Sequence, residues 1–233
     1  MKILREANYQ GWVTLEYESK ADPFEGVPPL LAQLRSLIAG GPAGPKGEAE
    51  WKPLFHGKKL EPWKPTNFAG AGEVRVEKGQ ITMDAGNDLT GINLAEAPAK
   101  MDYEVVMDAM RIEGDDFFCG FTFPVGDTHV SLIVGGWAGS VIGISHIKGD
   151  AAIENETTQF KKFDSGKWYR IRVRVTKPKI EAWIDDEQMV NLETADKTLA
   201  IRAGEIESSM PFGIATWRTK GALRDIKWRK VQK

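Results

Sequence analysis

Apolar and charged residues alternate along most of the chain from about residue 50 onward. The segment 101–114 is one example, in which Tyr103 and Val105 flank Glu104. Further along the same segment, Asp108 again lies between two apolar residues. A repeat of two residues is typical of a β-strand with one buried and one exposed face. The segment is therefore predicted to be a strand with its carboxylates directed away from the core.

The alternation returns in three further segments that also carry turn residues. Lys78-Gly79 divides a predicted hairpin over 73–84, and two turns divide three predicted strands over 167–193. The segment 211–231 supplies two closing strands, and no convincing amphipathic helix interrupts the series. Many antiparallel strands without alternating helices favour an all-β, jelly-roll-like sandwich of about 180 residues.

The first fifty residues follow another pattern. A short apolar strand, GWVTLEYE, precedes leucines at helical spacing in Pro28–Ile38, with prolines at the start of this helix and glycines at its end. The expected organisation is a strand-helix appendage over 1–38, a linker over 39–50 and the sandwich domain over 51–233. One strand and one helix cannot bury an apolar face alone. We therefore expect the helix to pack on the sandwich, in a homodimer, or on a barrel domain missing from this sequence.

The glycine-rich segment 127–147, DTHVSLIVGGWAGSVIGISHI, has two possible interpretations. A phosphate-binding loop would require a following helix and usually a Gly-Lys-Ser/Thr motif, and neither is present. The alternation predicts a hairpin instead, with His129 and Ser131 facing away from the core and Trp137 at the turn. Its glycines would leave room for a sugar ring that stacks on the tryptophan, or they would be bulges of a purely structural hairpin.

The amino-acid composition restricts the classes of partner that the protein is expected to bind. The chain has 31 basic and 33 acidic side chains and a net charge of -2, so neither nucleic acid nor an anionic membrane is an expected partner. The N-terminus lacks the apolar core of a signal peptide, which predicts a cytoplasmic protein unless the sequence is part of a longer precursor. The single cysteine, Cys119, lies in the apolar run FFCGFTF and is expected to be buried and unreactive.

Several segments resemble the 3-keto-disaccharide hydrolase-like domains: LFHGKKLEPWK, GDDFFCGFTFPVGDTHVSLIVGGWAGSVIGISHI, ENETTQF, KWYRIRVRVTKPKIEAWIDDEQMV and GIATWRTKGALRDI. The resemblance extends from Trp51 to about Val231. It implies a concanavalin A-like jelly-roll sandwich and a saccharide ligand. The segment YQGWVTLEYESKADPFEGVPPLLAQLRSLI is similar to the last strand and helix of sugar phosphate isomerase/epimerase-like barrels. Glu16 matches a metal ligand of those barrels, but the other seven strand-helix units are missing, so we interpret it as a relic.

The carboxylates limit the chemistry that the sandwich could perform. The Glu-x-Asp-x-x-Glu run of laminarinase-type glycosidases does not occur. A 3-keto sugar allows another route, because its ketone acidifies the hydrogen on C2, and a base can remove that hydrogen and expel the glycosidic oxygen. The candidate catalytic residues are His129, Glu154 and Glu156 as bases or acids, and Arg218 as the polarising cation. The candidate substrate-binding residues are Ser131, Trp137 and Trp217.

Two functions remain open at this point. One is a hydrolase acting on 3-keto-disaccharides or related glycosides, which the resemblance favours. The other is a non-catalytic carbohydrate-binding module that serves a fused or partner barrel. No zinc spacing and no EF-hand loop occurs, so no metal or cofactor is expected, although a calcium ion held by loop carboxylates and carbonyls stays open.

Overall fold

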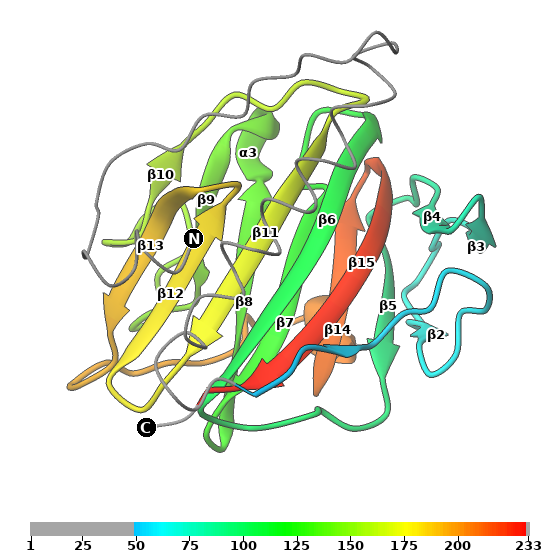
Figure 1. Ribbon diagram of the computed structural model, residues 1–233. Coiled ribbons are helices and arrows are strands. Elements are labelled where there is room, and N and C mark those ends of the chain that lie inside the picture. Colours follow the sequence, from blue (N-terminus) through cyan, green and yellow to red (C-terminus); the bar gives the residue numbers. More distant parts are fainter. Residues whose placement is uncertain (1–48, 232–233) are drawn as a thin grey trace, which may run out of the picture. The chain divides into compact units, whose positions relative to one another are not determined.

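The computed structural model describes residues 49–231, which form two antiparallel sheets packed as a sandwich (Figure 1). The predicted all-β sandwich is therefore confirmed. The predicted strand-helix appendage over 1–38, including the Pro28–Ile38 helix, and nearly all of the 39–50 linker lie outside the described residues.

Sheet A contains the long strands at the front of Figure 1. Its spatial order is β13 (Glu187–Glu193), β12 (Lys179–Ile184), β11 (Trp168–Val175), β6 (Tyr103–Glu113), β15 (Lys220–Lys230), β4 (Gln80–Met83) and β3 (Val74–Glu77), with β1 (Lys52–Pro53) also paired to β15. The predicted hairpin over 73–84 is β3–β4, and the three strands predicted over 167–193 are β11, β12 and β13.

Sheet B forms the second layer. Its spatial order is β10 (Gln159–Phe160), β9 (Val141–Ser145), β8 (Thr128–Gly135), β7 (Cys119–Val125), β14 (Phe212–Trp217), β5 (Leu89–Leu94) and β2 (Lys64–Pro65). Two short elements join its strands: the single turn α3 (Gly136–Gly139) lies between β8 and β9, and the 3-10 helix η1 (Glu205–Ser209) precedes β14.

The core lies between the sheets and follows the alternation of the sequence. Strand β6 directs Tyr103, Val105 and Met107 into the core, where each is at most 1% exposed. Strand β7 contributes Cys119, which is fully buried, and burial raises the pKa of its thiol to about 12. The prediction of a buried, unreactive cysteine is therefore confirmed.

The glycine-rich segment forms the predicted hairpin, β8–β9. Val130 and Leu132 enter the core, so Ser131 between them faces outward from sheet B. At the turn, Trp137 and Ala138 adopt the left-handed backbone region, with φ angles of 47° and 62°. The hairpin therefore directs its polar residues to the face of sheet B that lies away from the core, which we call the outer face of sheet B.

The outer face of sheet A carries carboxylates surrounded by arginines. Glu104 has a fully buried side chain, and its carboxylate accepts hydrogen bonds from Arg172, Arg174 and Arg229 at 3.3, 2.9 and 2.7 Å. The pairing register explains this convergence, because Glu104 of β6 lies opposite Arg174 of β11 on one side and Arg229 of β15 on the other. The charged positions of three strands therefore meet at one buried anion.

Tryptophans stack on these guanidinium groups. The guanidinium carbon of Arg172 lies 3.9 Å from the ring centroid of Trp183, and that of Arg224 lies 4.1 Å from the centroid of Trp168. Planar guanidinium groups favour such stacking, which covers the aromatic face without removing the hydrogen bonds of the charge. We call this surface the arginine face of sheet A.

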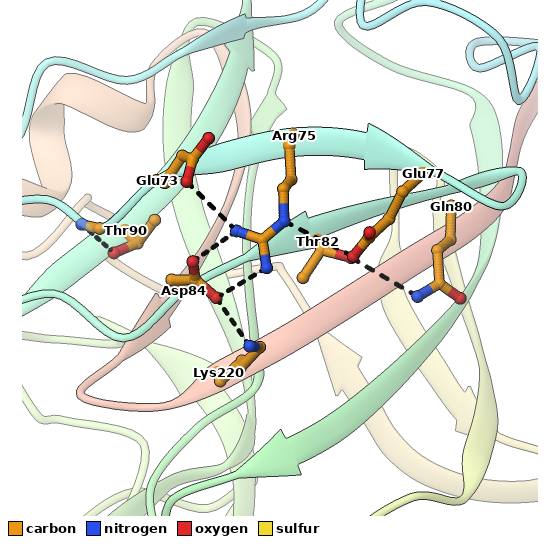
Figure 2. Close-up of polar contacts among 9 residues, drawn as sticks. Glu73, Arg75, Glu77, Gln80, Thr82, Asp84, Thr90 and Lys220 are labelled. Atoms are coloured by element: carbon orange, nitrogen blue, oxygen red, sulfur yellow. Dashed lines mark hydrogen bonds and ion pairs between the residues drawn. The ribbon is translucent and has the colours of Figure 1, made fainter.

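A second charged network joins the strands at the other end of sheet A (Figure 2). Arg75 of β3 donates two hydrogen bonds to Asp84, one of them at 3.2 Å, and Lys220 of β15 lies 3.0 Å from the same carboxylate. Arg75 also forms ion pairs with Glu73 and Glu77. The hydrogen bond from Arg75, and then that from Lys220, lower the pKa of Asp84 to about 2.

The substitution Asp84→Asn should lower stability at neutral pH. The pKa of Asp84 falls from 3.8 to about 2 on folding, so its contribution is present above about pH 4 and is lost as the pH falls through about 2. Because the side chain is 31% exposed, we expect a loss of about 1 kcal/mol at pH 7 in denaturant unfolding, vanishing near pH 2. The control is Asp127→Asn, which removes the exposed ion pair with Lys100 and should leave the free energy of unfolding unchanged. A loss independent of pH would contradict the electrostatic explanation.

Candidate functional site

A cavity of about 440 Å³ opens on the outer face of sheet B. Three separate parts of the chain form it: the start of β5, the stretch from the loop before β7 to the end of β9, and the stretch from the connection before η1 to the end of β14. The lining residues are Asp88, Leu89, Asp116, Phe117, Ser131, Ile133, Trp137, Ser145, Arg202, Ala203, Glu205, Ile206 and Trp217.

Aromatic side chains form much of the wall. Phe117 and Trp217 are both half-buried, and their ring centroids lie 6.4 Å apart. Leu89 and Ile206 belong to the same small apolar cluster, and the half-buried Trp137 adds a further ring to the lining. A cavity with aromatic walls and a few polar groups suits a ligand with both apolar and polar faces.

Asp116 is the carboxylate most affected by this environment. Burial raises its pKa, and the backbone N–H groups of Phe117, Trp137 and Ala138 lower it in part by hydrogen bonding. The Phe117 N–H lies 2.7 Å from the Asp116 carboxylate. Asp116 therefore holds the α3 turn and also presents a carboxyl group whose proton affinity is increased, as is typical of acid–base residues.

Arg111 supports the same turn from the side of sheet A. This strand β6 residue is 6% exposed, and its guanidinium donates hydrogen bonds to the carbonyl oxygens of Gly139 at 2.8 Å and Gly135 at 3.5 Å. Its charge also lies over the ring of Phe118, at 5.3 Å from the centroid. The position of Trp137 thus depends on a buried cation behind the turn.

The glycines of the hairpin make room for protein atoms. A Cβ atom at Gly135 would lie 2.7 Å from a guanidinium nitrogen of Arg111, and one at Gly139 would lie 3.0 Å from the other. A Cβ atom at Gly143 would lie 2.7 Å from the carbonyl oxygen of Ala152. The expectation that these glycines leave space for a ligand is therefore wrong, because a distant arginine and a neighbouring loop occupy that space.

Charged residues complete the lining. Arg202 and Glu205 are both exposed and belong to the connection between β13 and β14. Asp88 accepts hydrogen bonds from Arg218 at 2.6 and 2.9 Å, and the Arg218 guanidinium lies 5.4 Å from the ring centroid of Trp217. The lining thus contains the guanidinium of Arg202 and carboxylates in different environments.

The structure brings together the three predicted substrate-binding residues. Ser131, Trp137 and Trp217 all line the cavity, and the Ser131 hydroxyl shares a 2.8 Å hydrogen bond with Thr122. Arg218 does not line the cavity and reaches it through Asp88.

The other predicted catalytic residues do not line this cavity. His129 is half-buried at the opposite end of β8, where burial and then Lys100 lower its pKa. Glu154 and Glu156 are exposed residues of the loop between β9 and β10. Glu156 forms an ion pair with Lys197 beside a second, polar cavity.

Sequence reasoning missed Asp116, Arg202 and Glu205. A signal for Asp116 exists in hindsight, since it directly precedes the apolar run that forms β7 and therefore lies at a strand end. Arg202 and Glu205 belong to a connection without periodicity, so no pattern could place them. Among residues 49–231, no group of three or more His, Cys, Asp or Glu side chains could hold a metal ion. The same part of the chain contains no helix that is long and apolar enough to span a bilayer.

Solved structures with the same fold include several carbohydrate-related proteins. The Crh5 transglycosylase in complex with NAG has a TM-score of 0.54 at 12% identity, over 80% of this chain and 86% of that one. An endo-acting O-glycanase of the human gut microbiota has a TM-score of 0.51 at 13% identity, over 80% of this chain and 100% of that one. A candidate glycosyl hydrolase from Parabacteroides distasonis ATCC 8503 has a TM-score of 0.50 at 13% identity, over 78% of this chain and 94% of that one. These likenesses establish the sandwich fold.

The sequence comparisons add the family. No curated protein matches the chain in a sequence search. The family model of the 3-keto-alpha-glucoside-1,2-lyase-like domain matches residues 50–232, which is the whole sandwich. This match confirms the resemblance seen in the sequence and identifies a carbohydrate-related β-sandwich. The chain belongs to the 3-keto-alpha-glucoside-1,2-lyase-like domain family.

Proposed function

We propose that the cavity on the outer face of sheet B binds a 3-keto glycoside and cleaves its glycosidic bond by acid–base chemistry. The observation that carries this proposal is the placement of Asp116, a carboxylate of raised pKa between aromatic side chains of the cavity. The family to which the chain belongs supports the substrate class.

The chemistry needs three groups that the lining contains. Asp116, as the base, takes the proton on C2 that the neighbouring ketone acidifies, and a raised pKa makes it a stronger base. Arg202, as the cation, stabilises the negative charge that develops on the ketone oxygen. The electron pair then forms the C1–C2 double bond while the C1–O bond breaks, and the leaving oxygen receives a proton through Glu205. Addition of water to the unsaturated product at C1 would make the net reaction a hydrolysis.

The residues proposed from the sequence have different parts in this scheme. Ser131, Trp137 and Trp217 bind the sugar ring. Arg218 positions Asp88 and Trp217 by its hydrogen bonds and its stacking. His129, Glu154 and Glu156 receive no role, because they do not line the cavity.

A second candidate function is saccharide binding without catalysis. It is favoured by the aromatic wall of Phe117, Trp137 and Trp217, since a binding module requires only aromatic rings and hydrogen-bonding groups. The two functions differ in one observable: the binder has affinity for saccharides and no turnover with 3-keto disaccharides.

The substitution Trp137→Ala should weaken saccharide binding about tenfold, because it removes one stacking ring from the cavity. Calorimetric titration with a 3-keto disaccharide and its unoxidised parent measures the effect. The matched control is Trp183→Ala, which removes a stacked tryptophan from the arginine face of sheet A and should leave affinity unchanged. Equal affinity of the Trp137 variant and the unaltered protein would contradict binding in this cavity.

A further inference from the structure

We propose that the saccharide-binding surface continues beyond the cavity to Phe160, which stacks on the second sugar ring of the glycoside. This inference rests on the proposed function of the cavity. Phe160 belongs to the edge strand β10 and is 67% exposed, and it is the one large hydrophobic side chain exposed within residues 49–231.

The strand register places Phe160 on the same face as the cavity. Phe160 pairs with Val141 of β9, and Gln159 pairs with Ile142. Ile142 belongs to the core, whereas Ser145, on the other side of the same strand, lines the cavity. Because paired residues project to the same side of a sheet, the Phe160 ring projects outward with Val141 and Ser145.

The same register places Phe160 close to the turn that carries Trp137. Val141 is bridged to Gly136, the residue directly before Trp137. The backbone N–H of Lys161 donates a 2.9 Å hydrogen bond to the carbonyl oxygen of Ser140, which follows the turn. Two strand spacings therefore separate the backbone at Phe160 from the start of the turn, a distance of about 10 Å.

The residues on either side of Phe160 in the chain direct their polar groups toward β13. The Lys161 ammonium lies 2.6 Å from the carboxylate of Glu187, which belongs to β13 of sheet A. Gln159 lines the second cavity, next to β13. Phe160 is thus an uncharged aromatic ring that stands alone at the edge of the outer face of sheet B. An exposed aromatic ring of this kind can stack on the apolar face of a pyranose.

The direction of the proposed reaction gives this ring a role. The ring that bears the ketone must lie in the cavity, next to Asp116 and Arg202. We place the sugar attached through the breaking C1–O bond outside the cavity, where the backbone of Phe160 lies two strand spacings from the start of the Trp137 turn. We therefore assign Phe160 to the leaving-group unit and the cavity to the oxidised unit.

Two ligands of different length separate this inference from the proposed function. One is a 3-keto disaccharide, and the other is methyl 3-keto-glucoside, which has a methyl group in place of the second ring. In calorimetric titration, Phe160→Ala should weaken binding of the disaccharide several-fold and leave binding of the methyl glycoside unchanged. Phe160→Trp should restore the affinity for the disaccharide. Trp137→Ala should weaken the binding of both ligands.

Three results would overturn the assignment. Unchanged affinity of Phe160→Ala for the disaccharide, with both ligands weakened by Trp137→Ala, would remove Phe160 from the site and leave the proposed function intact. An equal loss for both ligands in Phe160→Ala would show that the ring acts through the Trp137 turn and not on the second sugar. Absence of binding of either ligand to the unaltered protein would overturn the proposed function itself, and the role of Phe160 with it.

Discussion

Replacement of Asp116 by asparagine should lower kcat on a 3-keto disaccharide by a factor on the order of 10² to 10⁴ while the dissociation constant stays within a few-fold. The amide oxygen of asparagine has two acceptor sites, so it can keep two of the three hydrogen bonds from the N–H groups of Phe117, Trp137 and Ala138, and the α3 turn should stay in place. The amide cannot take a proton from C2, so the loss should be confined to kcat.

The pH dependence provides an independent check on this assignment. A base must be deprotonated to act, so activity should rise with pH through the pKa of Asp116, which burial places above the ordinary value of 3.8. The exposed neighbour Asp115 raises that pKa further by charge repulsion. The control variant Asp115→Asn should therefore remain active, with its acidic limb shifted to lower pH. Full activity of Asp116→Asn, or an unshifted limb in Asp115→Asn, would contradict the role of Asp116.

The substitution Glu104→Gln should destabilise the sandwich by about 3 kcal/mol, because it removes the buried negative charge that three arginines share. For a domain of this size, such a loss corresponds to a fall in Tm of roughly 10 °C. Thermal unfolding followed by circular dichroism measures it. Saccharide affinity should not change, since the arginine face of sheet A lies on the opposite side of the sandwich from the cavity.

The matched control for this prediction is Glu181→Gln. Glu181 is a half-buried carboxylate of β12 that accepts a 3.1 Å hydrogen bond from Gln188, and its replacement should cost less than about 1 kcal/mol. A similar small loss for Glu104→Gln would show that the arginines are stabilised by solvent and by their tryptophans, and that the buried carboxylate contributes little.

The sequence predicts those features of the fold that depend on the local alternation of apolar and polar residues. The inward and outward faces of β6 follow from neighbouring residues, and so does the hairpin that carries Ser131 and Trp137. The convergence of three arginines on Glu104 could not be predicted, because it depends on the registers of β6 with β11 and with β15. Those registers bring Glu104 to Arg174 and Arg229, which lie 70 and 125 positions further along the chain.

The candidate site was predicted only in part for the same reason. The sequence alone predicts free space at the glycines 135 and 139, because nothing near them in the sequence indicates that Arg111, 24 residues before Gly135, fills this space. Asp116 and Arg202 lie in loops, where side-chain direction follows from the tertiary fold and has no periodic signal. Residues on strands could be oriented from the sequence, and residues on connections could not.

The connection between β13 and β14 contributes Arg202, Glu205 and Ile206 to the cavity, whereas most of the other lining residues belong to strands or to the α3 turn. It is attached to the hairpin by backbone hydrogen bonds between His146 and Ala200, at 2.9 and 3.3 Å. An insertion or deletion after this attachment would change Arg202 and Glu205 in the cavity lining without altering a residue of the core between the sheets. Members of this family could thus acquire new substrates by exchanging one surface segment, while the rest of the sandwich is inherited unchanged.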